Sequence, residues 1–414
     1  MAARTHPGYT VTMTTFTPRV RLLDDSDFVA FHRVVNSAFL KTATEAEVER
    51  DRVQFANGRF HGAFDGDELI GGAGILSKRM TIPGTGPRAV AGVTAVATAV
   101  DSRRRGVLTS LMRAQLEGLR DEAAQPIAAL WCSEAGIYGR FGYGLATMRL
   151  FTGVPRGAAF LSTVDCGSER VRELPREDAF VAMKEIYERV APSRIGWLAR
   201  TDDDWQHWYH DDGPTALRFA VLSEAYAAYR VRKEWTLRGP QHKVEVHEIA
   251  SVNPVAHSAI WRYLLDLDLT GEVIYENLAV DDPLPHMLVD HRAATRKVGD
   301  ALWLRLVDVD RALVERHYSA PADLVLELED AFCPWNAGRW RFTVDSDGVA
   351  RVQRSDDDAD LVLSTTELGS LFLGGVGVAG LAGAARIREL RPGALAALGL
   401  AFSTEHQPHS PDLF

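Results

Sequence analysis

An apolar strand pattern that runs into a basic turn, and from there into an amphipathic helix, constrains the fold of this chain more than any other feature. The strand pattern covers residues 88–100, the turn is Arg103–Gly106, and a helix is predicted over Val107–Ala123. Apolar residues recur along this helix at the spacing of one buried face: Leu108, Leu111, Met112, Leu116 and Leu119. A strand, a turn and a helix in this order predict one unit of an α/β domain.

The turn has the chemistry of an anion-binding site. The first turn of a helix carries backbone N–H groups without a partner and the positive end of the helix dipole, and both attract phosphate. Gly106 allows a close approach of the backbone because it has no Cβ. Three successive arginines concentrate positive charge here, although the chain as a whole has a net charge of −10. A solvated basic helix start is the alternative, and the flanking strand and helix favour the anion site.

A second motif follows the next predicted strand, residues 127–133. It reads Ser-Glu-Ala-Gly-Ile-Tyr-Gly-Arg-Phe-Gly-Tyr-Gly over residues 133–144. Together with the strand, Arg-x-x-Gly turn and helix, this run resembles the Eis (enhanced intracellular survival) family of the GNAT superfamily of N-acetyltransferases. The resemblance extends over nearly the whole chain and implies an acetyl-CoA-dependent N-acetyltransferase, with acetyl-CoA as cosubstrate.

The chain is expected to form three domains, because 414 residues exceed the usual size of one domain two- to threefold. The fold class implied by the resemblance is α/β (α+β), with two tandem GNAT-like domains followed by a sterol-carrier-protein-like α+β domain. The expected boundaries are 1–155 for the catalytic domain, 156–300 for a degenerate GNAT-like domain and 301–414 for the third. Helices near residues 367–372, 380–390 and 394–402 are predicted to close the third domain.

The central domain repeats the order of strands and helix seen in the first, which suggests a duplication. Its junction at Ile249–Pro254 lies where a phosphate loop belongs, yet it contains neither glycine nor arginine. We therefore expect this domain not to bind coenzyme A.

The resemblance also implies the residues that hold acetyl-CoA. Backbone groups of one strand would pair with the pantetheine arm and the acetyl carbonyl: Val96, Ala97 and Thr98. The turn and first helical residues would hold the pyrophosphate: Arg104, Arg105, Gly106, Val107, Leu108 and Thr109. Ser133 and Glu134 would line the end of the next strand beside the thioester. Leu108 replaces the small residue of most acetyltransferases, and the Eis branch also carries a larger residue there.

Two catalytic residues are implied in the same way. Tyr138 would be the general acid for the departing thiolate, and its phenol, with a usual pKa near 10, suits this role as a positioned hydrogen-bond donor. The carboxylate of the last residue, Phe414, would accept a proton from the acceptor amine or orient it, because an α-carboxylate is ionised at neutral pH. The alternatives are a packed core tyrosine and a frayed chain end.

The acceptor site is expected near Phe39 and Asp412. Eis relatives acetylate amines of aminoglycosides, and the net negative charge suits a cationic acceptor. Lys41 and Leu413, however, occupy positions where aminoglycoside-active relatives carry acids, and a lysine repels a polycation. Asp412 is the acid that would substitute by attracting the acceptor.

The composition limits which metals, partners and cellular locations are expected for this chain. The cysteines Cys132, Cys166 and Cys333 lie far apart, so neither a disulfide framework nor a zinc site is expected, and no metal cofactor is predicted. The acidic balance disfavours a nucleic-acid partner. The polar segment Met1–Thr17 lacks the apolar core of a signal peptide, and no run is long enough to cross a membrane, so a cytoplasmic protein is expected. The resemblance implies a homo-hexamer.

The function expected from these observations is acetylation of amines on an aminoglycoside-type or other polyamine acceptor. A transferase that acts on protein lysine or on a small polyamine is the alternative among enzymes. A lipid-binding carrier with a vestigial acetyltransferase domain is the alternative from another class, and the complete arginine loop and Tyr138 argue against it.

Overall fold

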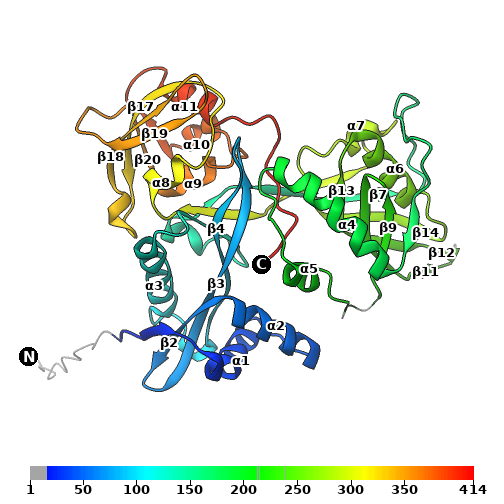
Figure 1. Cartoon of the computed structure of the whole chain (residues 1–414), viewed down its shortest axis with the longest axis horizontal. Coiled ribbons are helices and arrows are strands. Elements are labelled where there is room, and N and C mark those ends of the chain that lie inside the picture. Colours follow the sequence, from blue (N-terminus) through cyan, green and yellow to red (C-terminus); the bar gives the residue numbers. More distant parts are fainter. Residues whose placement is uncertain (1–15, 212, 214, 238) are drawn as a thin grey trace, which may run out of the picture. The chain divides into compact units, whose positions relative to one another are not determined.

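The computed structural model of the chain describes residues 16–211, 213, 215–237 and 239–414 (Figure 1). The chain forms two compact units. The first unit contains the residues up to Ile75 and Ala95–Gln115, and the second contains Leu76–Thr94 and Leu116–Phe414. Most of the polar segment Met1–Thr17 lies outside the described residues.

The first unit is built on an antiparallel β1-β2-β3 arrangement. Its complete elements are β1 (Arg19–Leu22), α1 (Phe28–Ala38), α2 (Glu45–Asn57) and β2 (Arg59–Asp65). Strands β3 (Glu68–Ile82) and β4 (Gly86–Thr98) and helix α3 (Val107–Glu122) belong partly to this unit and partly to the other. The segment Asp65-Gly66-Asp67, a residue type pattern typical of hairpin turns, joins β2 to β3.

The first turn of α3 packs directly on β3 because a glycine lies beneath it. A Cβ at Gly71 would be 2.5 Å from a methyl carbon of Val107 and 3.0 Å from the carbonyl oxygen of Ala97. Val107 is 2% exposed, so the helix is anchored by its first residue. This close packing fixes the start of α3 against the end of β4, where the sequence predicts the phosphate loop.

The second unit contains strands of two large sheets, and each of these sheets includes a strand that the sequence assigns to a different domain. In one, β4 pairs with β5 (Ile127–Trp131), which pairs with β16 (Leu302–Leu306), and β16 pairs with β6 (Gly144–Leu145). The other has the order β15-β7-β14-β13-β10-β9-β8. Its strands are β7 (Met148–Pro155), β8 (Arg172–Leu174), β9 (Arg218–Leu222), β10 (Ala225–Arg232), β13 (His242–Ser251), β14 (Thr270–Ala279) and β15 (Thr295–Asp300).

These pairings change the domain limits expected from the sequence. Strand β7, expected as the last element of the first domain, pairs with β14 and β15 of the second sheet. Strand β16, expected as the first element of the third domain, pairs with β5. Leu302, Leu304 and Leu306 of β16 are fully buried, so this strand requires a place inside a sheet. Its partner is distant in the sequence, and the local pattern could not reveal it.

Helices pack on the second sheet. The elements of this domain follow the predicted order of three strands, a helix and a strand: β9, β10, β13, α6 and β14. Asn253 caps α6 by accepting a hydrogen bond from the backbone N–H of Ala256, 2.9 Å away. The helices of this domain are α4 (Arg176–Val190), α5 (Asp202–Trp208), α6 (Pro254–Leu265) and α7 (Leu284–Met287), and a small hairpin consists of β11 (Trp235–Thr236) and β12 (Gly239–Pro240).

The C-terminal domain has a sheet of order β19-β18-β17-β20-β21 with helices packed on it (Figure 1). The strands are β17 (Ala322–Glu329), β18 (Gly338–Val344), β19 (Ala350–Arg354), β20 (Leu361–Ser364) and β21 (Ile387–Glu389), and the helices are α8 (Val309–Leu313), α9 (Thr365–Leu371), α10 (Val378–Gly383) and α11 (Ala394–Phe402). The helix expected over residues 380–390 is wrong in its second half. Ala385 has a φ of +58°, which ends the helical direction, and Ile387 then pairs with Leu363.

After α11 the chain continues as an extended segment, residues 403–414, which we call the tail. The side chains of residues 408–412 are buried, which is unusual for a chain end. No helix in the described part of the chain is long and apolar enough to cross a membrane.

Candidate active site

The predicted phosphate loop has the backbone conformation of an anion site. Arg104 and Gly106 have φ values of +63° and +83° and flank Arg105, which lacks a positive φ. Alternation of this kind turns successive N–H groups toward one side, and such nests bind anions. The loop leads directly into α3, whose first N–H groups have no partner within the helix. A Cβ at Gly106 would meet nothing within 4 Å, so its backbone conformation alone favours glycine.

The arginines of this loop differ in their partners. The guanidinium of Arg105 donates to the Asp65 carboxylate at 2.7 Å and lies 3.8 Å from the centre of the Phe16 ring. Arg103 and Arg104 are exposed and form no ion pair with the described residues. Arg104 is therefore the loop residue that combines an unpaired charge with the strained backbone.

Strand β4 is irregular just before the residues predicted to bind the pantetheine arm. Ala95 has a φ of +49°, a conformation that costs a residue with a Cβ about 1–2 kcal/mol. Strain of this kind persists where the surroundings enforce it, often at functional sites. Of the residues that follow, Ala97 is buried, whereas Val96 and Thr98 are half-buried.

Tyr138 lies in a short 3₁₀ helix, Tyr138–Phe141, and its side chain is 6% exposed. Burial raises the pKa of Tyr138 to about 12, and the neighbouring Cys132 and Glu134 add to the rise. The phenol therefore keeps its proton at neutral pH. Ser133 and Glu134 lie between β5 and this helix with exposed side chains.

The glycines of the Tyr138 motif allow it to pack on the C-terminal domain. A Cβ at Gly144 would overlap the carbonyl oxygen of Thr366, and Gly142, with a φ of +81°, lies against the guanidinium of Arg305. Arg305 donates to the Phe141 carbonyl at 2.7 Å and forms a buried ion pair with Asp330. The motif is thus a packing surface that holds Tyr138 in place.

The end of the chain lies on the strands that precede this motif. The pairing of β4 with β5 ends at Gly92 and Ala129 within the described residues, although β5 continues to Trp131. A Cβ at Gly92 would be 3.1 Å from the ring of Phe414. The indole N–H of Trp131 donates to the carbonyl of Asp412 at 2.8 Å.

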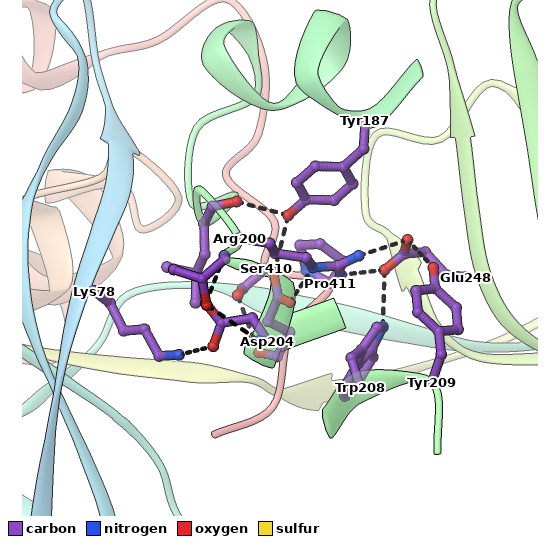
Figure 2. A network of polar contacts seen from close by, with 12 residues as sticks. Lys78, Tyr187, Arg200, Asp204, Trp208, Tyr209, Glu248, Ser410 and Pro411 are labelled. Carbon is purple, nitrogen blue, oxygen red and sulfur yellow. Dashed lines mark hydrogen bonds and ion pairs between the residues drawn. The ribbon is translucent and has the colours of Figure 1, made fainter. Parts of the chain in front are cut away.

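Asp412 is buried and does not face solvent. Its partners belong to a polar network around Arg200 and Glu248 (Figure 2). Arg200 donates through Nε to Asp412 at 2.6 Å and through its two terminal nitrogens to Glu248 at 3.1 and 2.5 Å. The side chains of Arg200, Glu248 and Asp412 are 1%, 0% and 9% exposed. Further donors to Glu248 are Trp208, Tyr209 and Tyr226.

Two carboxyl groups share one guanidinium in this network. Burial opposes ionisation of Glu248, but Arg200 and the tyrosine hydroxyls outweigh it and lower the pKa of Glu248 to about 2. Burial raises the pKa of Asp412, and the Glu248 charge adds to this effect while Arg200 opposes it. Of the two carboxyls, Glu248 is therefore the more readily ionised.

The hydroxyl of Tyr187 connects Asp412 to the segment before α5. It donates to the carbonyl of Leu198 at 2.8 Å and to the carboxyl of Asp412 at 3.1 Å. The sequence predicts that this carboxyl attracts the acceptor, and in the structure it accepts from Arg200 and Tyr187.

Comparisons with known proteins agree with this architecture. Models of an acetyltransferase (GNAT) domain match residues 19–146 and 196–314, and a sterol carrier protein domain matches residues 309–411. An N-acetyltransferase of Streptomyces avermitilis is 39% identical, over 96% of this chain and all of its own. The N-acetyltransferase Eis of Mycobacterium tuberculosis is 35% identical, over 83% of this chain and 85% of its own. The crystal structure of Eis1 from Mycobacterium abscessus has a TM-score of 0.84 at 32% identity, covering 96% of this chain and all of that one.

The chain belongs to the Eis family of N-acetyltransferases. It has two GNAT domains and a C-terminal sterol-carrier-type domain, as the sequence predicts. Among the described residues of this Eis-family enzyme, no group of three or more His, Cys, Asp or Glu side chains is placed to hold a metal ion.

The predicted site residues of the enzyme are divided between the two units. The loop Arg104–Thr109, Val96–Thr98 and Phe39 belong to the first, and Ser133, Glu134, Tyr138, Asp412 and Phe414 belong to the second. Phe39 is the exposed residue that follows α1, and Lys41 lies in the same turn, where its N–H donates to the carbonyl of Asn36.

Four residues around the tail, Gly92, Trp131, Arg200 and Glu248, were not predicted from the sequence. None of them lies in a motif, and their positions in the sequence are far from Asp412 and Phe414. Only the aromatic residue at the chain end indicated that the tail is anchored.

The contacts of Asp412 predict how two substitutions differ. In Asp412→Asn the amide oxygen still accepts from Arg200 and the amide N–H₂ donates to Tyr187, so the melting temperature at pH 7 should stay near that of the wild type. Asp412→Ala leaves the Arg200 Nε–H without an acceptor and should cost on the order of 1–3 kcal/mol. Differential scanning fluorimetry measures both.

The raised pKa of Asp412 fixes the sign of the pH dependence. A carboxyl whose pKa is raised in the folded state contributes stability at low pH that is lost as pH rises through the folded-state value. The stability of Asp412→Asn relative to the wild type should therefore increase as pH rises above about 4. Asp204, whose pKa is lowered chiefly through Lys78 against the effect of burial, is the control. The stability of Asp204→Asn relative to the wild type should decrease as pH rises toward about 4 and change little above it. Parallel curves for Asp412→Asn and the wild type would contradict the raised pKa.

Proposed function

We propose that this enzyme uses acetyl-CoA to acetylate a primary amine of a cationic small molecule of the aminoglycoside or polyamine type. Acetyl-CoA supplies an acetyl group activated as a thioester. The observation that carries the proposal is the buried tail, which holds the ring of Phe414 against Gly92 on a strand of the catalytic domain.

The loop Arg104–Thr109 fits the pyrophosphate of coenzyme A. Its positive φ values at Arg104 and Gly106, the free first turn of α3 and the unpaired charge of Arg104 all favour an anion. Val96, Ala97 and Thr98 would hold the pantetheine arm, and Ser133 and Glu134 would line its end. The corresponding junction of the central domain is less suited, because Pro254 lacks an N–H and Asn253 already caps α6.

Tyr138 and Phe414 would carry the proton chemistry. A phenol of pKa about 12 remains protonated and donates a hydrogen bond to a developing thiolate. Full proton transfer to a thiolate of pKa about 8.5 is uphill, so stabilisation by the hydrogen bond is the main contribution. The α-carboxylate of Phe414 would orient the amine and accept its proton.

The acceptor class follows from charge. The net charge of −10 attracts cations, while the exposed Lys41 opposes a polycation in its vicinity. A protein lysine and a small polyamine are the competing acceptors, and assaying thiol release with aminoglycosides, spermidine and a lysine peptide distinguishes them. The cytoplasmic location and the homo-hexamer stay predictions from the sequence.

Arg104 should contribute more to cofactor binding than Arg105. Arg104→Ala should weaken acetyl-CoA binding about 10- to 100-fold through the loss of a charged hydrogen bond. Arg105→Ala removes a charge that Asp65 already neutralises, so its effect should be smaller. Isothermal titration calorimetry measures both, and equal losses or none would contradict the loop assignment.

Removal of the Tyr138 hydroxyl should affect turnover and leave cofactor binding intact. Tyr138→Phe should lower kcat by on the order of 10²-fold, the usual cost of removing one hydrogen-bond donor to a developing negative charge. Tyr143→Phe is the matched control, because the Tyr143 hydroxyl is buried in the same motif and has no hydrogen-bond partner among the described residues. Near-normal turnover of Tyr138→Phe would assign the acid role elsewhere.

Extension of the chain by one glycine after Phe414 tests the terminal carboxylate. The addition moves this group by roughly 3.3–3.6 Å, beyond hydrogen-bond reach. We expect kcat to collapse while the melting temperature and acetyl-CoA affinity remain close to those of the wild type. Full activity of the extended enzyme would reject this mechanism.

A further inference from the structure

The tail is held by a series of contacts that ends at Asp412. The Gln407 N–H donates to Asp281 at 3.0 Å and the His409 N–H to the carbonyl of Ile195 at 2.9 Å. Asn277 donates to the carbonyl of Ser410 at 3.1 Å. Among the described contacts, Asp412 is the last residue of the tail that is held by hydrogen bonds, through its carbonyl by Trp131 and through its side chain by Arg200. The ring of Phe414 packs beyond it beside Gly92. Leu413, which follows, is 43% exposed.

Asp412 therefore determines where the chain end lies. Only two residues, Leu413 and Phe414, follow it. A chain segment of this length spans at most about 7 Å, so the α-carboxylate stays near the anchor. Release of Asp412 would leave the packing of the Phe414 ring as the remaining contact that holds the chain end.

Arg200 is a rigid support for this anchor. Its guanidinium is fixed by Glu248 and lies 4.1 Å from the centre of the Tyr187 ring and 5.0 Å from that of Trp205. Figure 2 shows Arg200 extended toward Glu248, with Ser410 and Pro411 of the tail beside it. Because the fork is held on one side by Glu248, its Nε–H presents a fixed donor to the tail.

The cost of this arrangement indicates a use beyond stability. Desolvation of two carboxyls and a guanidinium is unfavourable, and apolar residues of similar volume often stabilise a protein as well or better. Buried polar groups can instead specify one geometry among several. Here the geometry that they specify is the path of the last residues of the chain.

We propose that Arg200 is a positioning residue for catalysis, which holds Asp412 against Glu248 and thereby fixes the terminal carboxylate of Phe414. The inference rests on the proposed function, because it assigns a role to that carboxylate. Arg200 itself touches neither acceptor nor cofactor in this scheme and acts only through the tail.

A double-mutant cycle tests this role. Asp412→Ala and Arg200→Lys should each lower kcat, tenfold or more, toward the value of the glycine-extended enzyme, with the KM for acetyl-CoA unchanged. In the extended enzyme the same substitutions should change kcat less than twofold, because the group through which they act is already displaced. The proposal would be overturned if the substitutions lowered kcat by the same factor in the extended enzyme as in the wild type. An unchanged kcat in the single variants would also overturn it.

A direct readout of the tail separates positioning from a general loss of stability. Release of phenylalanine by a carboxypeptidase should be faster in Asp412→Ala and Arg200→Lys than in the wild type. Asp412→Ala leaves the Arg200–Glu248 pair in place, so it remains informative if Arg200→Lys does not fold. Arg316→Lys is the control, because Arg316 is fully buried and donates to the carbonyls of Phe372 and Phe402, which lie outside the tail and are 40 and 10 positions from Asp412 (412 − 372 and 412 − 402).

The possible failures are distinguishable. Full activity of the glycine-extended enzyme would overturn the proposed role of the carboxylate and with it the catalytic meaning of Arg200. Unchanged phenylalanine release in Asp412→Ala would overturn the anchor alone. Faster release in Arg316→Lys, at a matched fall in melting temperature, would assign the effect to general destabilisation and would also overturn the proposal.

Discussion

The buried contact of Arg200 with Glu248 and Asp412 connects the central domain to the last residues of the chain. Glu248 belongs to β13, Arg200 precedes α5, and Asp412 belongs to the tail. Since one guanidinium serves two carboxyls, its donors are all used only when the tail is in place. The tyrosine hydroxyls and the Trp208 indole complete the remaining positions. The position of the chain end thus depends on residues of a domain that has no predicted role in chemistry.

A similar dependence exists for the catalytic acid. The motif that contains Tyr138 lies on Arg305, whose partner Asp330 belongs to the C-terminal domain. Gly142 and Gly144 are required because Arg305 and the backbone of α9 occupy the space that side chains would fill. Strand β16, which carries Arg305, is inserted beside β5 and brings this support to the catalytic domain. The central and C-terminal domains therefore act as the scaffold for Tyr138 and for the tail.

The sequence predicted the local parts of this arrangement well. Residues 88–123 have the periodicity and composition of a strand, an arginine turn and a helix, which few other structures share. The structure has β4, the loop and α3 there. The hairpin at residues 65–67 and the order of elements in the central domain were also predictable, because each depends on neighbours in the chain. The end of α10 could not be predicted, because Ala385 adopts a positive φ that the residue pattern does not indicate.

By itself the sequence determined the family, the three-domain composition and the residue types available for chemistry, because these reside in contiguous motifs. The tertiary structure decided which strands exchange between the sheets, why the motif glycines are needed, and what Asp412 contacts. The charge of Asp412 predicts a group that attracts cations, yet its partners Arg200 and Glu248 are 212 and 164 positions away (412 − 200 and 412 − 248). A carboxyl group has the same formula in solvent and in a buried network, and only its surroundings decide whether it carries a charge, holds a proton or anchors a chain end.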